Sequence, residues 1–381
     1  MSEVQNTNTR SLVRPPVVSV GALGWVKKNL LSNWFDSILT IFAIYLLYNL
    51  IPPIIELAFI DAHWGDSWNK DDLDRGECEQ FVDGNKIKEG ACWSFIRFWF
   101  PEILYGRYPQ DETWRINLGF GLLLVAVVPL FFPKYKWKKW NGLFLGFGFP
   151  VIAYILFVGD SFGLPYVETN LWGGLFLTLV LGIFGIVFSL PFGIILALGR
   201  RSKMGAVKGI SIAFIEFWRG VPLITVLFMA SAMFPLFMPE GVTVDKLIRC
   251  MAGIMFFSAA YMAEVVRGGL QAIPRGQYEA AQAMGLSYGK MMALIILPQA
   301  LRIVIPGIVN TFIGLFKDTT LVLIIGLFDF LGMIQFVGTN PDWLGFHIEG
   351  YVFAAVVFWF FCFGMSRYSM SLERKIGVDR K

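Results

Sequence analysis

The chain has 381 residues, of which 56% are hydrophobic, 16% aromatic and only 16% charged. Soluble domains carry about 25% charged residues, so this composition excludes an ordinary soluble protein. Several stretches exceed the roughly 18 apolar residues that indicate a membrane span, and the short alternating segments of a β-barrel are absent. The net charge of +4 does not indicate nucleic-acid binding, since basic residues in a membrane protein report its orientation. The sequence therefore predicts an all-α polytopic membrane protein with about eight transmembrane helices.

The chain begins with a basic segment, residues 1–33, which has no signal-peptide cleavage site after the first apolar run. We expect it to be a cytoplasmic tail that leads into a retained anchor. The first span, Trp34–Ile51, is expected to end at Pro52 and Pro53, because consecutive prolines usually stop a helix.

A polar segment at about residues 53–114 follows, acidic and rich in tryptophan. We expect it to face the periplasm. Cys78 and Cys92 both lie in it, and an oxidising compartment permits a disulfide between them. Two cysteines in one loop need not meet geometrically, so a disulfide and two free thiols stay open as alternatives.

The remaining spans are expected at Arg115–Phe132, Asn141–Val158, Leu171–Leu198, Val221–Phe237, Leu247–Val266, Ile303–Leu327 and Tyr351–Met365. Ahead of the fifth span, Ile210–Gly220 is predicted to lie along the inner face of the membrane. Every basic cluster falls on one side of this arrangement, which places both termini in the cytoplasm. By composition, residues 34–160 form a three-span extension, residues 171–370 a five-span core and residues 371–381 a cytoplasmic tail.

The cytoplasmic loop before the seventh span carries the most informative motif. It reads YEAAQAMGLSYGKMMALIILP from Tyr278 to Pro298. The pattern is Glu-Ala-Ala, three residues, Gly, nine residues and Ile-x-Leu-Pro, at Glu279, Ala280, Ala281, Gly285, Ile295, Leu297 and Pro298. A short helix is predicted over 277–284, ended by the glycine. Three alanines would leave one face smooth enough to enter a groove on a partner, although each feature alone also fits an ordinary turn.

This pattern resembles the EAA signature of the permease subunits of ABC importers. The flanking text, FWRGVPLI, AYMAEVVRGGLQAIPRGQYEAAQAMGLS, LPQALRIVIPGIVN and LFKDTTLVLIIG, is similar to the polar amino-acid uptake branch of that family. The added N-terminal spans resemble the larger general L-amino-acid permeases of Gram-negative bacteria.

The resemblance implies a subunit of the bacterial inner membrane with a five-helix core of the type I importer fold. It implies a second, similar permease, two copies of a partner ATPase that bind ATP and Mg²⁺, and a periplasmic amino-acid-binding protein. It implies no catalytic residue, metal or cofactor in this chain. Residues 285–291, GLSYGKM, also have the wrong glycine spacing for a phosphate-binding loop.

Ionisable residues inside a membrane are costly and are candidates for function. Lys317, Asp318, Thr319 and Thr320 lie within the seventh span, where Asp318 would hold the substrate ammonium and the threonines its carboxylate. A buried Lys-Asp pair that only sets packing is the alternative. Asn310, two turns earlier, either lines the same path or bonds to a neighbouring helix.

The other polar residues fit structural roles better. Glu264 and Arg267, and likewise Glu216 and Arg219, are spaced i, i+3 and are expected to form ion pairs. Neither of the two histidines falls within a span or has metal-ligand spacing, which disfavours an intramembrane hydrolase. An ion-coupled secondary transporter with Asp318 as coupling site is the alternative function, but it leaves the Glu-Ala-Ala loop unexplained.

Overall fold

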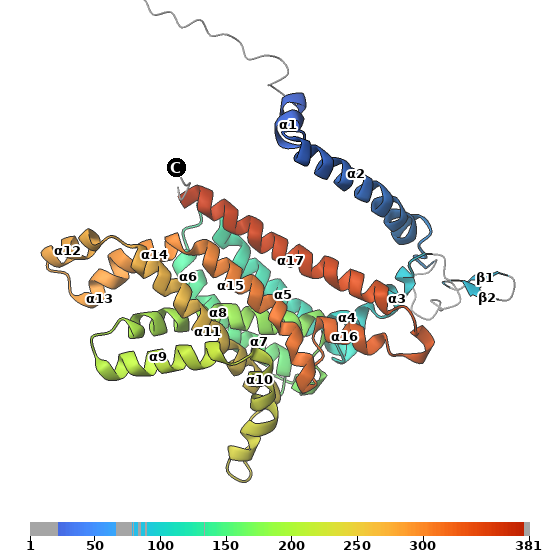
Figure 1. Cartoon of the computed structure of the whole chain (residues 1–381). Helices are drawn as coiled ribbons and strands as arrows, with labels where there is room; N and C mark the ends of the chain where they lie inside the picture. Colours follow the sequence, from blue (N-terminus) through green and yellow to red (C-terminus); the bar gives the residue numbers. More distant parts are fainter. Residues whose placement is uncertain are drawn as a thin grey trace, which may run out of the picture. The chain divides into compact units, whose positions relative to one another are not determined.

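The computed structural model describes residues 22–65, 78, 80–82, 85–87, 90–132 and 134–376. Nearly all of its elements are helices, as predicted (Figure 1). By their internal contacts the residues divide into two units, Met1–Asp66 with Gly76–Trp93, and Ser67–Arg75 with Ser94–Lys381. Each unit is described separately.

The first unit contains a long apolar helix and a short hairpin. Helix α1 is Ala22–Asn29, and α2 is Trp34–Ile55, which continues as a π-helical turn over Glu56–Ile60. Strands β1 (Gln80–Val82) and β2 (Asn85–Ile87) pair in antiparallel fashion. The candidate span is therefore 27 residues long, Trp34–Ile60, which is enough to cross a bilayer.

The prediction that this span ends at Pro52 and Pro53 is wrong. Both prolines lie inside α2, and their carbonyl groups accept hydrogen bonds from the backbone N–H of Glu56. Proline removes its own N–H but keeps its acceptor, and membrane helices tolerate it where the freed groups find other partners. The apolar residues that follow the prolines let the helix continue to Ile60.

The same unit holds the bond between Cys78 and Cys92, whose Cα atoms are 5.6 Å apart. Both side chains are buried. The backbone N–H of His63 donates to the carbonyl of Ala91 at 2.8 Å, and the N–H of Trp93 donates to the carbonyl of His63 at the same distance. These contacts hold the residues around Cys92 against the end of the α2 span.

We expect two of the four cysteines to resist thiol reagents until a reductant is added. Closing a loop of this length is worth about 3 kcal/mol in the chain-entropy account. The measurement is maleimide-polyethylene-glycol labelling of the denatured protein, with and without prior reduction. Unreduced protein should gain two labels and reduced protein four, and the Cys78→Ser Cys92→Ser double variant should gain two in either case. Four labels on unreduced wild-type protein would contradict the bond.

The second unit contains the other candidate spans. Counting α2, the described residues include seven helices long and apolar enough to cross a membrane, or up to eight with one bent pair. Those of the second unit are Gln110–Phe131, Lys138–Val158, Gly174–Arg200, Lys246–Ala272, Ile305–Ile325 and His347–Arg374. Their α-helical parts are α5 (Thr113–Val127), α6 (Lys138–Leu143), α7 (Phe149–Val158), α8 (Gly174–Arg200), α11 (Lys246–Ala272), α15 (Ile305–Asp318) and α17 (His347–Ile376).

The bent pair consists of α9 (Gly205–Gly220) and the segment Leu223–Phe237, which meet at 101°. The second segment begins as α10 (Leu223–Phe228) and ends in π-helical and 3-10 turns. Val221 precedes Pro222 and has extended backbone angles, because a residue before proline is forced out of the helical region. This break separates the predicted helix of the inner face from the span after it.

Three short helices are not apparent from the sequence: α3 (Trp93–Phe98), α4 (Phe100–Tyr105) and α16 (Phe330–Val337). The first two fall within the polar segment predicted at about residues 53–114. Helices of six to eight residues span only about two turns, which is too short for a clear periodic signal.

The core of this unit is built on α8 and α11, which pack along each other. Gly193 of α8 makes this possible, since a Cβ atom there would lie 2.7 Å from the Cβ of Met262 on α11. The spans of α5 and α7 join the same core through aromatic side chains. The Phe157 and Phe176 ring centroids are 5.0 Å apart, and those of Trp172 and Phe176 are 4.9 Å apart.

Asp329 caps α16 and is fully buried. Its carboxylate accepts hydrogen bonds from the backbone N–H of Gly332 at 3.0 Å and of Leu331 at 3.3 Å. Burial raises the pKa of this carboxyl from its ordinary 3.8 to about 6, against the opposing effect of the backbone hydrogen bonds. Because the folded state then holds the proton to higher pH, the contribution to stability is present below about pH 4 and is lost as the pH rises through about 6.

Asp329→Asn is therefore expected to remove part of the fall in stability between pH 4 and 7, because an amide caps the helix without titrating. The measurement is thermal unfolding of the detergent-solubilised protein across this range. Asp342→Asn, at an exposed aspartate, is the matched control and should keep the wild-type slope. An unchanged slope in Asp329→Asn would contradict the assignment.

Candidate functional site

The loop between α11 and α15 folds into short helices. They are α12 (Arg275–Ala283), α13 (Tyr288–Met291), a π-helical turn (Met292–Ile296) and α14 (Leu297–Ile303). Helices α12 and α13 lie at one end of the unit, beyond the ends of the long helices (Figure 1). The loop is thus a folded helical surface at that end of the unit.

Gly285 ends α12 in a left-handed conformation, with φ of 73°. Its N–H donates to the carbonyl of Gln282 at 2.9 Å, and the N–H of Leu286 donates to that of Ala281 at 3.2 Å. This is the usual glycine cap, which bonds the last free carbonyls of a helix. A Cβ atom at Gly285 would meet nothing within 4 Å in this chain, so the left-handed backbone, and not crowding, favours glycine here.

The Glu-Ala-Ala residues point in different directions. Glu279 and Ala280 are exposed, whereas Ala281 is fully buried and packs in a core cluster with Ile273, Met291 and others. The expectation that Ala281 helps to form a smooth outer face is therefore wrong. Consecutive residues are rotated by about 100° around a helix, so Ala281 turns inward where Ala280 turns outward. Ile295 and Leu297 are half-buried, and Pro298 is exposed.

Two large side chains beside the glycine were missed by the sequence analysis. Met284 is 67% exposed and Tyr288 is 59% exposed. The available signal was a pair of large side chains, one on each side of a helix-ending glycine in a loop between two spans. Both side chains are therefore accessible on the surface of the loop.

Helix α12 is tied to the ends of α8 and α11. The hydroxyl of Tyr278 donates to the carbonyl of Leu270 at 3.0 Å, and Arg201 donates to that carbonyl at 2.9 Å. The Arg201 guanidinium also lies 3.2 Å from the Tyr278 hydroxyl and 5.6 Å from the centre of its ring. These contacts fasten α12 to the ends of both long helices.

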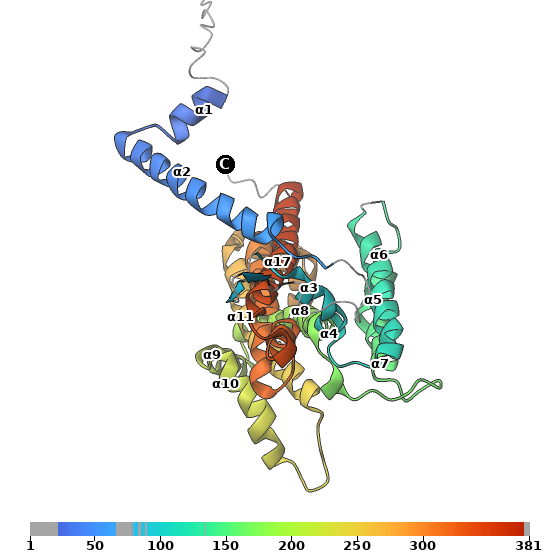
Figure 2. The ribbon, with the colours of Figure 1, turned by 90° about the vertical axis from the view of Figure 1, so that its right-hand side faces the viewer.

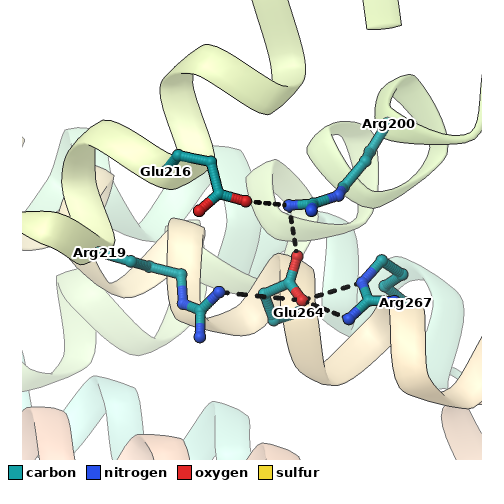
Figure 3. Close-up of polar contacts among 5 residues, drawn as sticks. All are labelled: Arg200, Glu216, Arg219, Glu264 and Arg267. Carbon is teal, nitrogen blue, oxygen red and sulfur yellow. Dashed lines mark hydrogen bonds and ion pairs between the residues drawn. The ribbon is translucent and has the colours of Figure 1, made fainter.

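A cluster of five charged residues lies next to this junction (Figure 3). We call it the Glu264 cluster; it consists of Arg200, Glu216, Arg219, Glu264 and Arg267. The predicted pair of Glu264 and Arg267 is confirmed at 2.6 Å. The predicted pair of Glu216 and Arg219 is replaced: Glu216 contacts Arg200 at 2.9 Å, and Arg219 approaches Glu264 at 3.9 Å. Arg200, outside the range of local spacing rules, also contacts Glu264 at 2.9 Å.

The polar residues of the seventh span are arranged along α15 and its end. Pro306, Asn310 and Lys317 are the exposed residues of this helix, and they lie on one side of it. Gly314 lies between Asn310 and Lys317, and a Cβ atom there would meet nothing within 4 Å. A charged side chain is too costly to face lipid in mid-membrane, so such a stripe is expected to face a partner subunit or water.

The threonines of this segment are used locally. The hydroxyl of Thr319 donates to the backbone carbonyl of Phe316 at 2.8 Å, and the hydroxyl of Thr320 donates to the backbone carbonyl of Lys317 at 2.9 Å. Thr319 is fully buried, whereas Asp318 and Thr320 are half-buried. Both hydroxyls bond where the α-helix changes to the 3-10 turn Thr319–Ile325. Among the described residues, no group of three or more His, Cys, Asp or Glu side chains is placed to hold a metal ion.

Comparison with known proteins gives consistent matches. The profile of a family described as "Binding-protein-dependent transport system inner membrane component" matches residues 189–378. The inner membrane amino-acid ABC transporter permease protein YhdY of Escherichia coli K12 is 51% identical over 362 residues, 94% of each chain. The glutamate/glutamine/aspartate/asparagine transport system permease protein BztC of Rhodobacter capsulatus is 40% identical over the whole of both chains. The chain belongs to the amino-acid ABC transporter permeases.

The permease is accordingly a multi-pass component of the inner membrane and has a transport role, not a catalytic one. Membership of this family implies ATPase partners and a binding protein. The Glu-Ala-Ala loop, the Glu264 cluster and the exposed residues of α15 all lie within the matched residues 189–378. The two relatives also align over the N-terminal spans, since they match 94% and 100% of this chain.

One solved structure, titled "Crystal structure of an amino acid ABC transporter with histidines", is 27% identical to this permease. It covers 53% of this chain and 92% of its own, with a TM-score of 0.47.

Proposed function

We propose that this permease translocates L-amino acids from the periplasm to the cytoplasm as part of an ATP-driven importer. The observation that carries the proposal is the helical loop of α12 and α13. Its outer surface bears Glu279, Ala280, Met284 and Tyr288, all exposed. Its base is fastened to α8 and α11 through Arg201 and Tyr278. A surface that is both exposed and firmly anchored suits the transfer of force from a partner.

In this proposal α12 lies in a groove on a partner ATPase, and two copies of the ATPase bind ATP with Mg²⁺. Glu279, Ala280 and Gly285 take part directly in the contact, while Ala281, Ile295, Leu297 and Pro298 set the position of the loop. Closure of the ATPases on ATP moves α12 and, with it, the ends of α8 and α11. ATP must favour the outward-facing state for access to alternate, because a ligand shifts an equilibrium only by its differential affinity.

The substrate path is proposed along the stripe of Asn310, Gly314 and Lys317. The Lys317 ammonium is suited to the substrate carboxylate, and Asp318 to its ammonium group. Thr320 lies close to both, whereas the buried Thr319 supports the change of helix type on which this arrangement depends. The exposed side of α15 then faces a second, homologous but non-identical permease across a shared cavity.

The remaining assignments follow the same scheme. Residues 171–370 form the transport core and residues 34–160 the N-terminal extension. The segment between the spans Trp34–Ile60 and Gln110–Phe131 is periplasmic and is closed by the Cys78–Cys92 bond. Both termini, 1–33 and 371–381, are cytoplasmic, on the side of the coupling loop. A periplasmic amino-acid-binding protein delivers the substrate to the opposite face.

The test is purification of the tagged permease from membranes in mild detergent, followed by an ATPase assay and by uptake in proteoliposomes. An ATPase that co-purifies, and amino-acid uptake that requires ATP and a binding protein, are expected. The alternative is an ion-coupled secondary transporter. A permease that purifies alone and moves amino acids on an ion gradient would replace the proposal with that alternative and would make Asp318 the coupling residue.

A further inference from the structure

We propose that Glu264 is a positioning residue that makes α9 move together with the coupling loop. The proposal rests on the function proposed above. It concerns a different step from ATPase binding, since Glu264 lies on α11 and its side chain is only 15% exposed.

Glu264 joins three helices through one carboxylate. Its Oε2 atom accepts hydrogen bonds from Nε and Nη2 of Arg267 at 2.8 and 2.6 Å. Its Oε1 atom accepts a hydrogen bond from Nη1 of Arg200 at 2.9 Å. Nη1 of Arg219 lies 3.9 Å from Oε2. Arg200 is the last residue of α8, Arg219 lies on α9 and Arg267 on α11, so the carboxylate is at the centre of the cluster (Figure 3).

The charge balance of the cluster depends on this residue. Three guanidinium groups surround Glu264, and the other carboxylate, Glu216, is 57% exposed and contacts Arg200. Replacing Glu264 by a neutral residue leaves three cations beside one solvent-screened anion. Breaking a partly buried charge group in this way is far more costly than losing an exposed pair.

The cluster adjoins the anchor of the coupling loop. Arg200 contacts Glu264, and the next residue, Arg201, contacts Tyr278 of α12. Arg267 is three residues before Leu270, whose carbonyl accepts from both Arg201 and Tyr278. Force applied to α12 therefore enters the ends of α8 and α11 at the level of the cluster.

Helix α9 is the element that needs this link. It packs on α8 and α11 and turns by 101° into the segment Leu223–Phe237. With Glu264 in place, α9 is bonded to both helices that hold α12, so that the bent segment follows the loop. Without Glu264, the Arg200–Glu216 contact is the ion pair that still ties α9 to α8, and its carboxylate is 57% exposed. An exposed pair contributes little, so we expect α9 to lag behind when α8 and α11 move.

The test compares amino-acid transport per ATP hydrolysed in proteoliposomes of the assembled complex. In Glu264→Gln we expect this ratio to fall roughly ten-fold or more, because a shift of 1.4 kcal/mol in the coupled equilibrium is sufficient. Co-purification of the ATPase and its hydrolysis rate should stay near wild type. Glu240→Gln, at an exposed carboxylate outside the Glu264 cluster, is the matched control and should keep the wild-type ratio.

A purely structural role would reduce the amount of complex and leave the ratio unchanged, and that result overturns the proposal. If Glu264→Gln does not accumulate in membranes, Arg200→Gln takes its place, since it cuts the link from α8 to both α9 and α11. An unchanged ratio in that variant also overturns the proposal. If the proposed function itself is wrong, the wild-type permease will purify without an ATPase. That result differs from an unchanged ratio in the Glu264 variant.

Discussion

Gly285→Val is expected to abolish both ATPase recovery and transport, whereas Gly285→Asn should retain most of both. The residue has φ of 73°, a conformation that costs an ordinary L-residue about 1–2 kcal/mol and a β-branched residue more. Asparagine enters this region several-fold more often than other side chains. Valine is therefore expected to unwind the end of α12 and to displace Met284 and Tyr288.

The measurement is the amount of ATPase that co-purifies with equal amounts of permease from membranes. Gly209→Val is the matched control, since Gly209 is an exposed glycine of α9 with open space around it. If the asparagine variant also fails to recover the ATPase, the partner must fill the space next to Gly285, which is empty in this chain. Full recovery in Gly285→Val would contradict the coupling role of the loop.

Lys317→Leu is expected to reduce transport by about ten- to a hundred-fold while the complex still assembles. A hydrogen bond to a charged group contributes roughly 1.5–3 kcal/mol, and each 1.4 kcal/mol corresponds to a factor of ten. Lys317 is exposed on a membrane helix, so its removal creates no cavity and should not harm folding. Lys317→Arg keeps the charge and should retain more transport than the leucine variant.

Transport is measured as uptake in proteoliposomes that hold equal amounts of assembled complex. Ile324→Ala, at a residue 53% exposed in the same span, is the control for an unspecific effect of changing the helix surface. Equal uptake by Lys317→Leu and the wild type would remove the stripe of Asn310, Gly314 and Lys317 from the proposed path.

The helical class and the order of the spans could be predicted because hydropathy is a property of adjacent residues. The predicted spans overlap those of the structure, including Gly174–Arg200 and Lys246–Ala272. The predicted helix boundaries were wrong where contacts beyond the local sequence decide whether a helix continues. The prolines of α2 do not end the helix, because their carbonyls still find donors. Helices α3, α4 and α16 owe their formation to packing and are too short for a periodic signal.

In the candidate site, too, some features could be predicted from the sequence and others could not. The spacing of Glu279, Gly285 and Pro298 was visible in the sequence, and so was the need for a helix-ending glycine at 285. The orientation of each side chain was not, since it depends on where the helix lies on the core. Ala281 faces that core, and Met284 and Tyr288 face outward.

Hydropathy, basic clusters and motif spacing, all properties of short stretches, are enough to predict a polytopic helical permease and to propose where its coupling loop lies. The Glu264 cluster could come only from the tertiary structure. The i, i+3 rule finds Arg267, but Arg200 lies 64 positions from Glu264 along the chain and belongs to another helix. The partners of this partly buried carboxylate are set by distances across packed helices, and those distances exist only after α8, α9 and α11 have come together.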